Sequence, residues 1–223
     1  MPKLIFDIET VASDFDSLDD KSKEFLIKFA ETEEEVEEIK NGLSFSPLTG
    51  RIVAIGILNP DSDNGAVYFQ ADNQTQSFKK DNRQFVACIE EGEILNNFWQ
   101  TALHYDRFII FNGRCFDNPY IMIRSAILKI KLTKNLMPNR YYDNHIDLLD
   151  RLTFFGAVRR KMNLHLWCQA FGIESPKSKG VSGSEVGQLF REGKYREIAE
   201  YCFDDLKATG ALYEYRDKYI NVK

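Results

Sequence analysis

Short apolar runs bounded by polar residues predict four β-strands in the first half of the chain. Residues 4–10 begin with apolar side chains and then alternate as Asp-Ile-Glu, which is typical of a buried strand whose acids lie at one end. Residues 51–58 are apolar almost throughout and lead into an Asn-Pro-Asp turn, so we expect residues 66–70 to pair with them as a hairpin. Residues 107–111 predict a further short strand.

Apolar positions recur at helical spacing in three later stretches, at residues 93–104, 163–171 and 195–219. The pattern is also mostly helical from residue 118, where Pro119 suits a first helical turn. Residues 145–149 fit a strand or a short helix equally well, and the pattern does not decide between them. Residues 174–183, rich in Ser, Lys and Gly, predict a loop.

A polar, acidic segment at residues 14–46 separates the first two predicted strands. Phe25 and Phe29 suit one face of a helix, and Thr32 with Glu35 forms a capping box for a second helix. We therefore expect an α/β fold in which helices flank a mixed sheet and a helical insertion follows the first strand.

Composition sets the broad class of the protein. With 223 residues, 43% hydrophobic and 28% charged, the chain is long enough for one well-filled domain spanning residues 1–223. No apolar run approaches the roughly 20 residues of a membrane span, and the N-terminus lacks the pattern of a secretion signal. We expect a cytoplasmic protein with no membrane partner. The four cysteines show no paired spacing of a zinc site or disulfide framework.

A net charge of −5 argues against a protein that coats nucleic acid by charge alone. The charge is uneven, however, because six glutamates lie between Glu31 and Glu38. Basic residues gather later in the chain, at Lys129, Lys131 and Lys134, at Arg159, Arg160 and Lys161, and at Lys177 and Lys179. An acidic total can therefore conceal a local basic track, although a solvated surface explains each cluster equally well.

The acids of the first strand are candidate metal ligands. Asp7 and Glu9 are two residues apart on a strand, so they share a face, and two adjacent carboxylates repel unless a cation lies between them. Such oxygen ligands suit Mg²⁺ or Mn²⁺. Taken alone, the pair is better explained as two solvated acids at the end of a strand.

Two later stretches place single acids where they could join this pair. Asp117 follows a strand and opens a helix, where a plain N-cap would serve as well. Tyr201 and Asp205 are one turn apart on the last predicted helix, so they share a face. Asp204 is rotated by about 100° and is expected to be a solvated neighbour.

In this order the three motifs resemble those of the DEDD superfamily of 3′–5′ exonucleases, in the DEDDy subtype with tyrosine in the third motif. Residues 112–121, Asn-Gly-Arg-Cys-Phe-Asp-Asn-Pro-Tyr-Ile, resemble the middle motif of the proofreading exonuclease of B-family DNA polymerases. The chain from residue 3 to about residue 216 resembles the stand-alone, predicted B-polymerase-like exonucleases. The acidic insertion has no counterpart that we can assign.

This resemblance implies an RNase H-like fold and hydrolysis of a phosphodiester at a free 3′ end by two divalent ions, Mg²⁺ or Mn²⁺. It implies that Asp7 bridges both ions, that Glu9 and Asp205 hold the ion on the side of the nucleophile, and that Asp117 holds the other. Tyr201, with an ordinary pKa near 10, would orient the attacking water rather than act as its base.

The expected partner is the 3′ end of a single nucleic-acid strand, with DNA favoured over RNA. Thr10, Asn112 and Phe116 are candidate contacts to the terminal nucleotide, and packing around the site explains them equally well. The alternatives are a 3′–5′ exoribonuclease with the same chemistry and a catalytically silent nucleic-acid-binding domain. The three histidines lie outside the third motif, so we expect structural roles for His104, His145 and His165.

Overall fold

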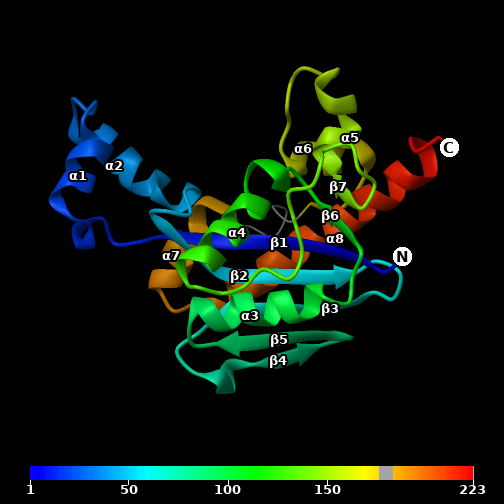
Figure 1. The fold of residues 1–223 in the computed structure, drawn as a ribbon, viewed down its shortest axis with the longest axis horizontal. Coiled ribbons are helices and arrows are strands. Elements are labelled where there is room, and N and C mark those ends of the chain that lie inside the picture. The colour runs from blue at the N-terminus through cyan, green and yellow to red at the C-terminus, as the bar shows by residue number, and fades with distance from the viewer. Residues whose placement is uncertain (176–182, 223) are drawn as a thin grey trace.

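The computed structural model describes residues 1–175 and 183–222, and at its centre lies a seven-stranded sheet (Figure 1). Across the sheet the strand order is β4-β5-β3-β2-β1-β6-β7. The strands are β1 (Lys3–Ala12), β2 (Gly50–Asn59), β3 (Asn64–Gln70), β4 (Phe78–Lys80), β5 (Arg83–Cys88), β6 (Arg107–Ile110) and β7 (His145–Asp147). β2 pairs antiparallel with β1 and β3, whereas β6 runs parallel to both β1 and β7, so the sheet is mixed as predicted.

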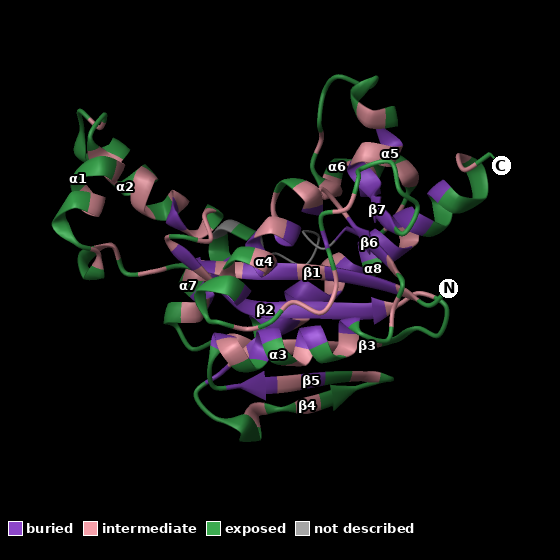
Figure 2. Ribbon diagram, viewed as in Figure 1, coloured by how far each residue is buried: buried purple, intermediate pink, exposed green. Residues whose placement is uncertain are grey.

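Helices cover both faces of this sheet, and the strands between them are largely buried (Figure 2). On one face α3 and α4 enclose a core with Leu4, Phe6 and Ile8 of β1. On the other face α8 packs on β1, β2 and β3 over a core that includes Ile5 and Val11. The helices of these two layers are α3 (Glu91–Ala102), α4 (Asp117–Ile127), α5 (Leu148–Leu152), α6 (Leu164–Phe171), α7 (Val186–Arg191) and α8 (Tyr195–Tyr219).

The sequence predicted most of these elements, with instructive exceptions. The hairpin of β2 and β3 is confirmed, and residues 145–149 resolve into both alternatives, because β7 ends where α5 begins. Two strands were not predicted, β4 and β5, which pair with each other beside β3. The expected helical continuation beyond α4 is wrong, since Lys129 adopts a left-handed conformation with φ of 58° that ends the helix. Most of the predicted loop at residues 174–183 lies outside the described residues.

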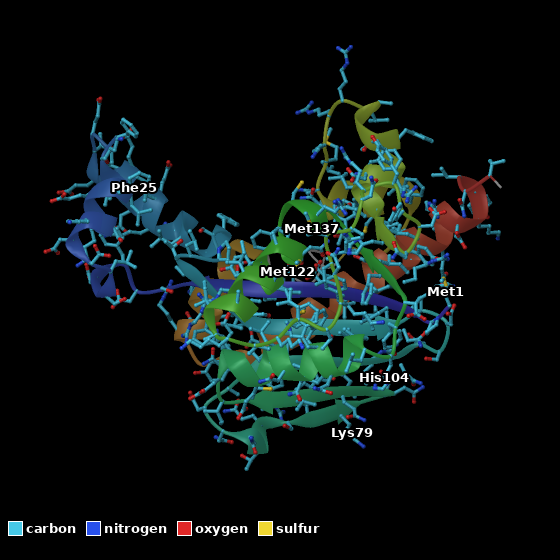
Figure 3. The ribbon with its side chains drawn as sticks, in the orientation of Figure 1. Met1, Phe25, Lys79, His104, Met122 and Met137 are labelled. Atoms are coloured by element: carbon cyan, nitrogen blue, oxygen red, sulfur yellow. The ribbon has the colours of Figure 1, made fainter. Side chains whose placement is uncertain are left out.

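The acidic insertion forms an arm made of α1 (Asp20–Ile27) and α2 (Glu33–Gly42), which projects from the sheet (Figure 1). The predicted capping box is present: the Glu35 N–H donates to Thr32 Oγ1 at 3.2 Å, and the Thr32 N–H donates to Glu35 Oε2 at 3.3 Å. Neither helix has a buried residue. Phe25 and Phe29 are 73% and 83% exposed, and Phe25 lies far from the sheet (Figure 3).

In the described ranges, no helix is both long and apolar enough to cross a bilayer.

Candidate active site

A cavity of about 660 Å³ opens where β1, the start of α4 and the middle of α8 meet. Seven of the eight residues proposed from the sequence line it: Asp7, Glu9, Asn112, Phe116, Asp117, Tyr201 and Asp205. Thr10 is not among the lining residues, and its hydroxyl instead donates to the Ser44 carbonyl at 2.9 Å. That hydrogen bond favours the packing interpretation of Thr10.

Alternation along β1 presents Asp7 and Glu9 to the cavity. Ile8, between them, points into the opposite core with α3 and α4. Carboxylate oxygens of the two acids and the sulfur of Cys202 lie within 4.8 Å of one another. The pairing of β1 with β2 shifts by one residue directly after Glu9, where Val53 of β2 has no partner in the register with β1.

Asp117 reaches this pair because β6 is shorter than β1. The parallel pairing of β6 with β1 extends only to Ile5, and beyond it the edge of β1 is uncovered on that side. There the Ile8 N–H donates to Asp117 Oδ1 at 3.1 Å. Asp117 is the first residue of α4 and Phe116 holds the N-cap position, so Asp117 is not the N-cap of this helix.

The close approach of α8 to the sheet supplies the remaining two side chains. Gly56 on β2 permits it, because a Cβ at that position would lie 2.7 Å from Leu206 Cδ1 and 2.9 Å from Cys202 Sγ. Tyr201 and Asp205 then face the cavity one helical turn apart.

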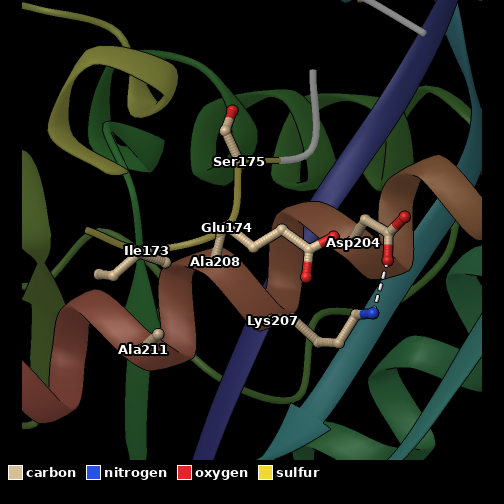
Figure 4. A pocket seen from close by; sticks show the side chains of 7 residues that line it. All are labelled: Ile173, Glu174, Ser175, Asp204, Lys207, Ala208 and Ala211. Carbon is tan, nitrogen blue, oxygen red and sulfur yellow. Dashed lines mark ion pairs between the residues drawn. The ribbon is translucent and has the colours of Figure 1, made fainter. Parts of the chain in front are cut away.

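Asp204 lies on a different face of α8. It forms a 2.6 Å ion pair with Lys207 and lines a separate cavity of about 310 Å³ beside residues 173–175 (Figure 4). Its side chain is half-buried rather than fully solvated, so the expectation of a solvated neighbour is wrong in that respect.

Burial and like charge dominate the electrostatics of the cavity. Burial, followed by repulsion from Asp117, Asp205 and Glu9, holds the pKa of Asp7 well above its usual range. Burial and then Asp205 and Asp117 do the same to the pKa of Glu9. The pKa of Asp117 rises to about 7, mainly through burial. A bound cation would favour the anionic form of carboxylates gathered in this way, because its positive charge offsets their mutual repulsion.

The donor set therefore fits hard divalent cations, which prefer carboxylate oxygens. Burial and the negative charge of Asp205 raise the pKa of Tyr201, so its phenol remains neutral at physiological pH. Burial and the nearby acids also raise the pKa of Cys202 well above its usual range, which keeps its thiol neutral and makes it a poor ligand for a hard ion.

Nine further lining residues among those described were not assigned to the site from the sequence, and they include Lys161 and Phe45. Lys161 is the one cationic side chain lining the cavity among the described residues, and its Nζ lies 4.0 Å from Cys115 Sγ. Phe45, which follows the arm, is 71% exposed, and its ring centre lies 6.4 Å from that of Phe116. The basic run at residues 159–161 is evident in the sequence, but only the fold brings Lys161 beside the acids of the cavity.

The histidines do not line the cavity in the described part of the chain, as expected. His145 is buried, and its Nε2 lies 3.1 Å from Asn118 Nδ2. Nδ1 of His165 lies 2.7 Å from the Ser175 hydroxyl, and His104 is exposed beyond α3 (Figure 3).

Comparison with solved structures supports the RNase H-like fold. The family B DNA polymerase from the hyperthermophilic archaeon Pyrobaculum calidifontis matches with a TM-score of 0.59 at 16% sequence identity. The match covers 96% of this chain, which spans only 24% of the polymerase chain. At this identity the likeness establishes the fold alone. No curated protein sequence matches the chain.

A family model supplies the sequence evidence. It describes a predicted 3′–5′ exonuclease related to the exonuclease domain of PolB, and it matches residues 45–218. That stretch contains Asp117, Tyr201 and Asp205 and begins after β1. Exonuclease domains of this type act on nucleic acid and use divalent metals. The chain belongs to this family of predicted 3′–5′ exonucleases related to the exonuclease domain of PolB.

Proposed function

We propose that residues 1–223 act as one 3′–5′ exonuclease domain that hydrolyses phosphodiester bonds at the 3′ end of single-stranded DNA and releases nucleoside monophosphates. The observation that carries this proposal is the meeting of four carboxylates and a tyrosine, drawn from β1, α4 and α8, in one cavity. Burying four acids together costs free energy, and a cation-dependent function accounts for that cost.

Two divalent ions, Mg²⁺ or Mn²⁺, would be held by Asp7, Glu9, Asp117 and Asp205. Asp7 would contact both ions, Glu9 and Asp205 the ion on the side of the nucleophile, and Asp117 the other. Bound there, such ions activate the attacking water and stabilise the leaving 3′ oxygen. Tyr201, whose raised pKa keeps its phenol neutral, is too weak a base to take a proton and instead orients the water through a hydrogen bond.

The remaining lining residues suit the end of a nucleic-acid strand. Lys161 places a positive charge in the cavity, where it would attract a phosphate. Phe116 and the exposed Phe45 offer ring faces on which bases can stack regardless of sequence. Asn112 is the candidate polar contact to the terminal nucleotide. A cavity of about 660 Å³ has the volume of a small-ligand site, which suits the terminal nucleotide of a strand.

The decisive assay uses 5′-labelled single strands of DNA and RNA of matched sequence, incubated with Mg²⁺ or Mn²⁺. We expect a ladder that shortens from the 3′ end, that forms faster on DNA, and that disappears with EDTA and in Asp7→Ala. A faster ladder on RNA would reassign the substrate to RNA with the same chemistry. A folded Asp7→Ala protein that still cleaves normally would overturn the site, and no cleavage of either strand by the wild type would favour a silent binding domain.

A further inference from the structure

The carboxylate of Asp147, at the end of β7, is a buried acid outside the proposed metal ligands. It is 4% exposed and accepts four backbone N–H bonds. Two come from the turn ahead of α4, where the N–H groups of Asn112 and Arg114 each lie 3.0 Å from a different carboxylate oxygen. The other two come from the first turn of α5, at 3.0 Å from Leu149 and 3.4 Å from Asp150.

The turn that Asp147 holds has an uncommon backbone conformation. Asn112 has a left-handed backbone with φ of 58°, a conformation that costs a non-glycine residue free energy. Gly113 follows in a close contact, because a Cβ there would lie 2.1 Å from Ile110 Cδ1. The turn then delivers Phe116 and Asp117 to the cavity. Its geometry therefore depends on the acceptor that takes up its N–H groups.

His145 holds the other end of the same segment. It precedes Asp147 by two residues, so the two side chains share one face of β7. Nδ2 of Asn118, the residue after Asp117, donates to His145 Nε2 at 3.1 Å and to the Leu136 carbonyl at 3.0 Å. β7 is thus hydrogen-bonded to both ends of residues 112–118. Asp147 binds the N–H of Asn112 at one end, and His145 binds the side chain of Asn118 at the other.

We propose that His145 and Asp147 are positioning residues that fix Asp117 for metal binding and fix Asn112 and Phe116 for the terminal nucleotide. This inference rests on the proposed function of the cavity. Asp147 is not a fifth metal ligand, because both of its oxygens already accept N–H bonds and it does not line the cavity. Outer groups that orient metal ligands typically contribute 10–100-fold to metal affinity or activity.

The test compares Asp147→Asn with Ser125→Ala. In Asp147→Asn an amide NH₂ replaces one acceptor oxygen and so faces an N–H donor in place of accepting from it. Ser125→Ala also removes a buried hydrogen bond, between Ser125 Oγ and Trp99 Nε1 at 2.8 Å, but further along α4 and outside the cavity. Both variants are measured at the same interval below their own Tm, which removes the effect of general destabilisation.

Three readouts separate positioning from plain stability: Mn²⁺ affinity by electron paramagnetic resonance, amide hydrogen exchange over residues 112–117, and kcat on single-stranded DNA. For Asp147→Asn we expect about 10–100-fold weaker Mn²⁺ binding or slower turnover, with faster exchange confined to residues 112–117. Ser125→Ala should match the wild type in all three. If Asp147→Asn fails to fold, His145→Ala is measured in the same way, with the same direction of change and a smaller loss.

Equal behaviour of Asp147→Asn and Ser125→Ala in Mn²⁺ affinity and in exchange overturns the proposal. Mn²⁺ affinity also separates this inference from the proposed function. The wild type could bind Mn²⁺ without cleaving DNA, while Asp147→Asn binds Mn²⁺ more weakly. That result would support the positioning role and reject the exonuclease activity. A wild type that binds no Mn²⁺ would reject both.

Discussion

The acidic residues of the arm are exposed to water, whereas those of the cavity are buried close to one another. Between residues 13 and 46 the chain has eleven acidic and four basic side chains, a net charge of −7 within a chain total of −5. Seven of these acids lie on α1 and α2, which have no buried residue, so water solvates them. The cavity holds only four acids, but burial and mutual repulsion raise the pKa values of Asp7, Glu9 and Asp117.

The difference shows that net charge is a poor guide to partners in this chain. Outside the arm the remaining residues sum to +2, although this part includes the acids of the cavity. The rest of the chain is therefore less acidic than the total suggests. Buried acids make metal binding and stability depend on their charge, whereas the acids of the arm should affect neither.

The largest expected effect comes from removing one proposed metal ligand. Asp205→Asn should slow hydrolysis by on the order of 10³-fold, because the charge-stabilising group is lost from a preorganised site. Asp204→Asn is the matched control, one residue away in the second cavity, and it should retain nearly full activity. Single-turnover cleavage of labelled DNA measures both, and equal losses in the two variants would contradict the assignment.

Metal binding should stabilise the cavity and not the arm. Mn²⁺ at 100 times its dissociation constant should stabilise the wild type by about 2.7 kcal/mol. In a chain of this length that corresponds to a rise in Tm of roughly 5–10 °C. The rise should vanish in Asp7→Ala and persist when Glu34 and Glu38 of the arm are changed to Gln. Differential scanning fluorimetry tests this, and a shift that depends on the arm would reverse the comparison.

Without divalent ions, stability should fall as pH rises from 6.5 to 8.5. Asp117, with a pKa of about 7 in the folded protein, binds a proton there that the unfolded chain has already released. Losing this proton lowers the free energy of unfolding by about 1 kcal/mol, so Tm should drop by roughly 2–4 °C. His145 has the opposite effect at lower pH. Burial lowers its pKa to about 4, so its titration makes stability rise with pH between about 4 and 6.5, below this window.

The control for this pH dependence is Asp117→Asn, which should flatten the slope of Tm against pH measured in EDTA. Changing Glu34 to Gln in the arm should leave the slope as it is. A slope that is equally steep in Asp117→Asn would show that the buried acids of the cavity do not set it.

The smallest effect is expected for the arm. Phe25→Ser with Phe29→Ser should change Tm by no more than about 1–2 °C, because exposed substitutions usually stay within ±0.5 kcal/mol. Phe98→Ala, in the core between β1 and α3, should instead cost about 3–5 kcal/mol. Thermal unfolding of the two variants measures the contrast, and a large loss in the arm variant would mean that it packs on the body.

What the sequence could predict follows from the range of the interactions involved. Alternation on β1 and the single turn between Tyr201 and Asp205 are local, so the shared faces could be predicted. The bond from Ile8 to Asp117 spans 109 residues, and only the resemblance to a known family linked the two motifs. Lys161 could not be assigned, because a short basic run carries no information about which cavity it borders.

The strands that were missed have a similar explanation. β4 has three residues, two of them lysines, and it is a strand only because β5 lies beside it. In the sequence, Asp147 is a single acid within residues 145–149, which could be a strand or a short helix. Its importance depends on the N–H groups of Asn112 and Arg114, which lie more than thirty residues earlier and turn towards it only in the fold.

The docking of α8 on β1 also fixes when, during folding, the cavity becomes complete. Cys202 Sγ meets the Asp7 carbonyl at 3.8 Å across 195 positions of sequence, so this contact closes a very long loop. A chain folded through β7 would bring Asp7, Glu9 and Asp117 together but would lack Tyr201 and Asp205. The proposed hydrolysis therefore requires α8 to be docked, and detachment of α8 would remove Tyr201 and Asp205 from the cavity.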